Sequence, residues 1–149
     1  MSVDFLAGKD DIFGIANAAF VSAAAAAGLA YTAQINFPDV LALPPNVDQI
    51  YAECSFVVVT EKQIALSRIG GKKGYQTVGL FAMQVFSPKT DASALRVAQT
   101  IASAVRDAFC QPPIPTEVWF RDQRLTPVSG SDTKNQTNVV VTCTYKTVR

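Results

Sequence analysis

The chain contains no histidine, and this absence excludes more chemistry than any other feature of the sequence. Without histidine there is no Ser-His-Asp or Cys-His nucleophilic site and no histidine-ligated metal centre. The three cysteines, Cys54, Cys110 and Cys143, lie far apart in the sequence, so they indicate neither a disulfide framework nor a zinc site. Cys54 and Cys143 lie in apolar, strand-like runs, where we expect buried thiols. Free thiols suit synthesis in a reducing, intracellular compartment.

The remaining polar patterns favour structural roles. The segment GGKKG at 70–74 lacks the spacing of a phosphate-binding loop and precedes no helix pattern. Asp10 and Asp11 suit the start of a helix, and Asp122, which stands between two arginines, suits a turn or an ion pair. The sequence therefore predicts no catalytic, cofactor-binding or metal-binding residue, and we expect the protein not to be an enzyme.

The composition favours a protein that other subunits partly cover. Of its 149 residues, 49% are hydrophobic and only 17% are charged, whereas about 25% are charged in typical soluble domains. The net charge of +1 argues against a basic nucleic-acid binder, which needs many cations on one face. The length suggests one domain that spans residues 1–149.

Residues 12–38 carry no charge and include the alanine-rich stretch ANAAFVSAAAAAGLAY. A signal peptide needs a positively charged start, whereas the residues before this run are mainly acidic. A membrane span needs about 20 strongly apolar residues, but this run is mostly alanine and is interrupted by polar side chains. We therefore predict a soluble helix that is capped by Asp10 or Asp11, follows an N-terminal arm at 1–10 and ends near Gly28.

Strand-like patterns follow this helix. The segment 50–60 is rich in β-branched and aromatic residues, and 63–70 alternates apolar with polar residues. These patterns predict an antiparallel pair that turns at residues 61–62. In the segment 75–88 both faces are largely apolar, as in a central strand, and Gly79 suggests a bulge.

A second alanine-rich helix is expected after Pro88, capped by Thr90 or Asp91 and continuing to residue 109. Its apolar residues recur at three- and four-residue spacing, which predicts one buried face. That face consists of Leu95, Ala98, Ile101, Ala102, Val105 and Phe109.

The C-terminal part predicts two short strands around Asp122, a polar loop at 129–136 and a final strand at 137–148. We expect this loop and the loop at 70–74 to be mobile. The predicted order is α-β-β-β-α-β-β-β. Two alanine-rich helices on one face of a mainly antiparallel sheet give an α+β fold.

The segment GLFAMQVFSPKTDASALRVAQTIASAVRDAF, residues 79–109, resembles the tail terminator, or tail completion, proteins of long-tailed bacteriophages of the lambda type. The matching residues are Gly79, Phe81, Val85, Phe86, Pro88, Ala98, Ile101 and Phe109. Weaker similarities are QINFP after the first helix, PPN before the first long strand, and VVVTCTYK near the C-terminal end. Two positions depart from the family pattern: Ala82, where the family often has glutamine, and Gln99, where it often has aspartate.

The resemblance implies a structural virion protein of the tail or neck, made in the host cytoplasm. Members of the family form a six-membered ring that caps the tail tube, ends its polymerisation and connects the tail to the head. The implied partners are further copies of the chain, the tail tube protein and a head–tail connector or neck protein. DNA would pass through the lumen without specific binding, and neither a membrane nor a cofactor is involved.

Loop character, and the open edges that sheets present, indicate where partners would bind. We expect partner contacts at Arg68, Lys72, Lys73, Tyr75, Trp119 and Lys134. Lys72 and Lys73 would also fit the solvated tip of a hairpin, with no partner contact. Trp119 is explained equally well by packing in the core and by an interface. Two other functions remain compatible with the sequence: a different neck or head–tail joining protein, and a small soluble α+β binding module.

Overall fold

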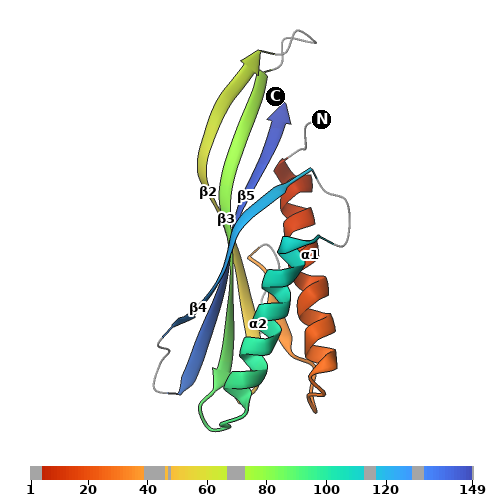
Figure 1. Ribbon diagram of the computed structural model, residues 1–149, viewed down its shortest axis with the longest axis vertical. Coiled ribbons are helices and arrows are strands. Elements are labelled where there is room, and N and C mark those ends of the chain that lie inside the picture. Colours follow the sequence, from red (N-terminus) through yellow and green to blue (C-terminus); the bar gives the residue numbers. More distant parts are fainter. Residues whose placement is uncertain are drawn as a thin grey trace.

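The computed structural model describes residues 5–38, 46, 48–66, 73–112, 117–128 and 133–148, and only the backbone at 5, 6, 65, 66, 73 and 148. The elements are α1 (Phe5–Ala26), β1 (Gln34–Asn36), β2 (Tyr51–Leu66), β3 (Lys73–Pro88), α2 (Ala94–Cys110), β4 (Trp119–Val128) and β5 (Lys134–Val148). The strands form one five-stranded sheet in the order β1-β2-β3-β5-β4, in which only the β1–β2 pair is parallel. Both helices cover the same face of this sheet (Figure 1). The expected α+β fold is confirmed.

The core lies between the two helices and the central strands β3 and β5. Phe81 and Met83 of β3 stand opposite Val141 and Val139 of β5, and all four side chains are fully buried. The Phe81 ring lies 5.1 Å from the ring of Phe109 on α2, measured between centroids. Alternation of side chains along each strand explains why every second residue of β3 and β5 enters this core.

The predicted buried face of α2 is confirmed with one change. Ala98, Ile101, Ala102, Val105 and Phe109 are buried as expected. Leu95 is only half-buried, and Ala94, which was not part of the predicted face, is buried instead.

The start of α1 differs from the prediction. The helix begins at Phe5 instead of after Asp10 or Asp11, so residues 5–10 of the expected arm are helical. Packing favours the extra turns, because Gly8 is buried and a Cβ placed there would lie 3.4 Å from the Tyr145 ring. The end of α1 is as expected: Gly28 adopts a φ of 69°, the left-handed conformation that ends many helices.

None of the helices in the described part of the chain is long and apolar enough to span a membrane.

The predicted hairpin turn at residues 61–62 is wrong, because β2 continues through it as one strand. Glu61 and Lys62 pair with Thr77 and Gln76 of β3. Two-residue hairpin turns favour Asn-Gly, Asp-Gly or Gly-Gly, and a Glu-Lys pair has no such preference for positive φ. The long strand instead contains two irregularities, where Val59 and Ile64 are extra residues relative to β3. The first is opposite Gly79, where a bulge was expected.

The two short strands expected around Asp122 form the single strand β4. Its register against β5 shifts between Arg121 and Arg124, and Asp122 has a φ of 54°. Aspartate tolerates this left-handed conformation better than most residues, so the irregularity is absorbed as a bulge and the strand continues. Arg121 Nε lies 4.0 Å from an Asp122 carboxylate oxygen, the ion pair that the sequence suggested.

Asp91 organises the turn before α2 and does not cap the helix itself. Its carboxylate accepts hydrogen bonds from the Ser93 hydroxyl at 2.7 Å and from the Ser93 N–H at 3.0 Å. These bonds favour the ionised form and lower the pKa of Asp91. The helix begins one residue after Ser93, whose own side chain makes no capping hydrogen bond.

Both loops expected to be mobile are partly strand. Residues 73–74 belong to β3 and pair with β2, and residues 134–136 belong to β5 and pair with β3. The remaining loop positions, 70–72 and 129–132, lie outside the described residues. Pairing extends further than expected because the hydrogen-bonded ladder tolerates the polar residues KNQ at the start of β5.

Candidate assembly surface

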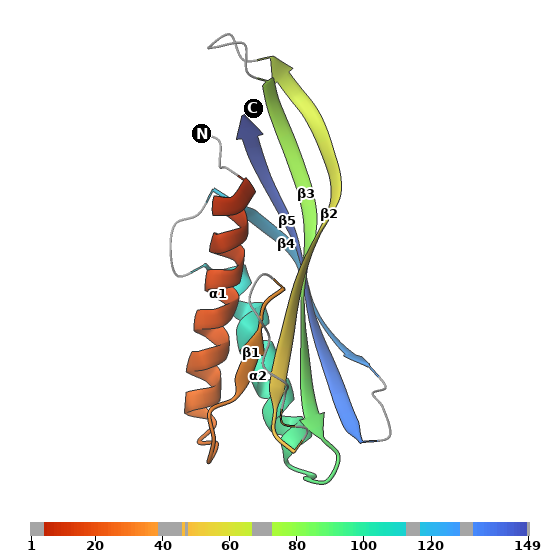
Figure 2. The same cartoon turned by 180° about the vertical axis from the view of Figure 1, so that it is seen from behind.

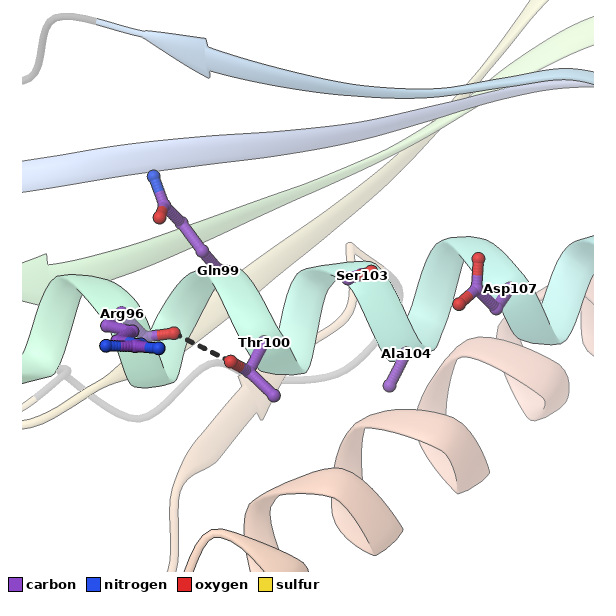
Figure 3. A pocket seen from close by; sticks show the side chains of 6 residues that line it. All are labelled: Arg96, Gln99, Thr100, Ser103, Ala104 and Asp107. Carbon is purple, nitrogen blue, oxygen red and sulfur yellow. Dashed lines mark hydrogen bonds between the residues drawn. The ribbon is translucent and has the colours of Figure 1, made fainter.

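A shallow surface groove on α2 is the first place to look for chemistry (Figure 3). It is lined by Arg96, Gln99, Thr100, Ser103, Ala104 and Asp107. Several of its polar groups are hydrogen-bonded within the helix. The Thr100 hydroxyl donates to the Arg96 carbonyl at 2.9 Å, and the neighbouring Arg106 donates to Ser103 and Asp107 at 3.1 Å. Among the described residues no group of metal-ligating side chains gathers here or elsewhere.

The two strand cysteines are buried thiols, as expected. Burial raises the pKa of Cys54 to about 12 and has the same effect on Cys143, so both stay protonated at neutral pH. Cys110, at the end of α2, is exposed. The thiolate is the reactive form, so the buried pair acts as small apolar residues of the core.

The six residues expected to contact partners do not form one cluster. Arg68 and Lys72 lie outside the described residues, and Lys73 opens β3 with only its backbone described. Tyr75 stands opposite Thr147, whereas Lys134 begins the same strand, β5, at its other end. At ~3.3 Å per residue these two sites are on the order of 40 Å apart.

Lys134 has a structural role within the chain. Its ammonium donates a hydrogen bond of 2.6 Å to the Tyr51 hydroxyl. It also lies 5.1 Å from the Tyr51 ring centroid and 5.6 Å from that of Phe86, and the two rings are stacked. These contacts join the starts of β2 and β5 to the end of β3, and they explain why Tyr51 is buried although the helices cover the opposite face.

Trp119 is exposed and is therefore not part of the core. It lies on the face of the sheet that the helices leave uncovered, where 55% of its surface remains accessible. Its register partner on β5 is Thr144, and the Lys146 ammonium lies 5.8 Å from its ring centroid. A large exposed aromatic residue that the fold does not bury is a candidate contact residue.

The long edge of β2 is the other candidate contact site. β1 pairs only with residues 51–53 of β2, so in the described part of the chain residues 54–66 have a strand neighbour on one side only. From Val57 to Ile64 every side chain is exposed, on both faces of the strand. Continuous exposure means that neither helix covers this part, and β2 and β3 indeed extend beyond both helices (Figures 1 and 2).

This projecting segment, which we call the β2 arm (residues 57–64), is apolar for a surface strand. Val57 is 61% exposed and Val59 is 56% exposed, and Val58 and Ile64 are also exposed. An open edge rich in β-branched residues is a site for pairing with another strand. The arm was not predicted because a turn was expected at residues 61–62. The sequence does carry a signal for a continuous strand, since no turn-forming residue stands there.

The three comparisons with known proteins give only structural similarities. No family model and no curated protein matches the chain. One solved structure, whose title gives no function, is 17% identical, covers 89% of this chain and 94% of its own length, and has a TM-score of 0.49. Another, titled "Virion of native gene transfer agent (GTA) particle", is 21% identical, covers 91% and 97%, and has a TM-score of 0.47. Structural similarities with such low sequence identity and TM-scores do not indicate a function for this chain.

Proposed function

We propose that this chain is a structural protein of a phage-like virion, which forms a ring on the tail tube and connects the tail to the head. In this role it has no catalytic activity and no cofactor. Its partners are further copies of itself, the tail tube protein and a connector or neck protein, and DNA passes through the ring. The sequence resemblance over residues 79–109 supports this function. Its matching residues Phe81, Ala98, Ile101 and Phe109 all lie in the buried core.

The observation that carries the proposal is the open, apolar β2 arm. A ring closes through head-to-tail contacts, in which one surface of a subunit meets a different surface of the next. In the part of the chain that the structure describes, residues 54–66 have a strand neighbour on one side only, and the arm adds exposed valines to this open edge. Such an edge is costly for a protein that stays monomeric, since it promotes uncontrolled pairing.

The β4 edge at the opposite side of the sheet is protected by comparison. It contains the bulge at Asp122 and Pro127, which cannot donate a backbone hydrogen bond. Bulges, prolines and charged side chains are the devices that keep edge strands from pairing. The difference between the edges supports β2 as the one used for assembly.

The test is the molar mass of the purified protein by light scattering, together with negative-stain images. We expect wild-type protein to form closed rings with a mass six times that of the monomer. Val59→Lys places a charge on the arm, so it should shift the protein to the monomer. The matched control is Val21→Lys, because Val21 on α1 is 53% exposed and lies away from the arm.

Rings that form equally well with Val59→Lys would show that the arm is not the assembly contact. Wild-type protein that stays monomeric at all concentrations, with or without tail tubes, would contradict the ring itself.

A further inference from the structure

The face of the sheet that the helices leave uncovered has an uneven charge. Register places Lys62, Arg121, Arg124, Lys134 and Lys146 on this face. Glu53 is the carboxylate that shares it in the described part of the chain, and Asp122 lies in the bulge beside Arg121. The net charge of +1 therefore hides a locally cationic surface, which we call the outer face.

The bulge in β4 is what brings two of these cations together. Arg121 pairs with Thr142 and Arg124 pairs with Val140, and those partners lie two residues apart on β5. In a regular strand, residues three apart point to opposite faces. The extra residue at Asp122 therefore turns both arginines to the outer face, where both are exposed.

The centre of the outer face is apolar. Leu80 and Ala82 of β3 are opposite Val57 and Ser55 of β2 and next to Thr142 and Val140 of β5. Leu80, Ala82 and Val140 are half-buried although no other element covers them among the described residues. Trp119 lies beside this centre, one row from Arg121. An apolar centre with tryptophan and arginine around it is the composition of a protein–protein contact.

The charge of the outer face distinguishes between the molecules that could bind there. A second copy packed outer face to outer face would oppose cations with cations, which is unfavourable. DNA would match the cations, but its contacts are made chiefly with phosphates and sugars, and the apolar row of Val57, Leu80 and Ala82 offers these groups nothing. A protein surface with carboxylates around an apolar centre matches both features.

We infer that the outer face docks a second, different protein whose own surface is apolar at its centre and rich in aspartate and glutamate around it. Arg121, Arg124 and Lys146 contact the carboxylates, and Trp119 and Leu80 contact the apolar centre. The inference rests on the proposed function only for the identity of this second protein. Under the proposed function, the second protein is the tail tube subunit or the connector.

Three labelled polyanions test this chemistry without the natural partner. Fluorescence anisotropy measures binding of a fluorescein-labelled glutamate–tyrosine copolymer, of labelled polyglutamate and of a short labelled DNA duplex, at low and physiological salt. We expect the copolymer to bind about tenfold more tightly than the other two, because it alone supplies both carboxylates and apolar groups.

Three variants locate the contact. Arg121→Glu with Arg124→Glu should weaken copolymer binding at least about tenfold, and the loss should shrink at high salt. The control, Lys89→Glu with Arg96→Glu, makes the same change in net charge at exposed positions away from this face and should have little effect. Trp119→Ala should weaken binding of the copolymer but not of polyglutamate.

Each alternative result overturns the inference. Preference for the duplex would identify a nucleic-acid surface, and equal losses in the two charge-reversal pairs would show an effect of net charge only. No loss with Trp119→Ala would exclude the apolar centre. The molar mass of each variant is measured in parallel, so a protein that binds the copolymer but never forms rings contradicts the proposed function and leaves this inference intact.

Discussion

The strands β2 and β3 run side by side for their whole length, yet their two ends are built for different purposes. Near Phe81 the sheet lies against both helices, and side chains alternate between a buried and a half-buried face. In the β2 arm the same strand is exposed on both faces. The two helices lie beside the first part of β2, and the β2 arm curves away from them (Figure 2). The first part of β2 therefore stabilises the fold, and the arm is available to partners.

The transition between these two parts is marked by Gly79. The bulge at Val59 lies opposite it, and the Phe56 ring lies across the position that a Cβ of residue 79 would occupy. Bulges increase the local twist of a strand. The glycine and the bulge together allow the strands to bend away from the helices, and the arm then projects from the core.

The largest effect of a substitution is expected where the sheet packs against both helices. Phe81→Ala should reduce the free energy of unfolding by about 3–5 kcal/mol, because the ring is fully buried and packs on Phe109 and Phe13. Chemical denaturation measures this loss. The control is Leu80→Ala, the next residue, which lies on the half-buried outer face and should cost clearly less. Equal losses would mean that the two faces of β3 contribute alike, which would contradict the division between core face and outer face.

The alternation that makes this prediction possible is visible in the sequence. The patterns of 75–88 and 137–148 were sufficient to predict β3 and β5, but not which face of each strand is buried, and spacing was sufficient for the buried face of α2. These elements have strong periodicity, and local preference agrees with the fold there.

The position of Trp119 could not be predicted in the same way, since it depends on a bulge. A bulge reverses the faces of all residues beyond it, so the side on which Trp119 and Arg124 lie depends on Asp122. The φ of 54° at that residue is a consequence of the β4–β5 pairing, which joins segments distant in sequence. The start of α1 likewise depends on Tyr145, far along the chain, against which Gly8 packs.

The second prediction concerns the transition itself. Gly79→Ala should reduce the free energy of unfolding by about 1–3 kcal/mol, because the new Cβ would lie 2.4 Å from Phe56 Cζ and 3.0 Å from the Val57 carbonyl oxygen. The ring can move aside, but the backbone oxygen cannot do so without altering the bulge. Thermal and chemical denaturation measure the loss.

Combining Gly79→Ala with Phe56→Ala separates these two clashes. If the ring causes most of the cost, the double variant will be more stable than the sum of the two single losses indicates. Strict additivity would show that the carbonyl contact, and therefore the bulge, is the cause.

A smaller effect is expected at the end of the sheet opposite the arm. Lys134→Met keeps the aliphatic stem but removes the hydrogen bond to the Tyr51 hydroxyl and the contact of the ammonium with two rings. The expected loss is about 1–2 kcal/mol in the free energy of unfolding. Tyr51→Phe removes only the hydrogen bond and should cost less. If Lys134→Met left stability unchanged but abolished assembly, Lys134 would be a partner contact, as the sequence first suggested, instead of a structural one.

The smallest effect is expected in the arm, and it is the most informative of the series. Val59→Lys should change the free energy of unfolding by no more than about 0.5 kcal/mol, since the valine is exposed and is the extra residue of a bulge. The measurement must be made at protein concentrations below those at which subunits associate, because association itself stabilises the folded chain. A change in oligomeric mass without a change in monomer stability would place residue 59 outside the core and inside a contact. A large loss of monomer stability would mean instead that the arm packs against its own chain, and the division between the two parts of β2 would not hold.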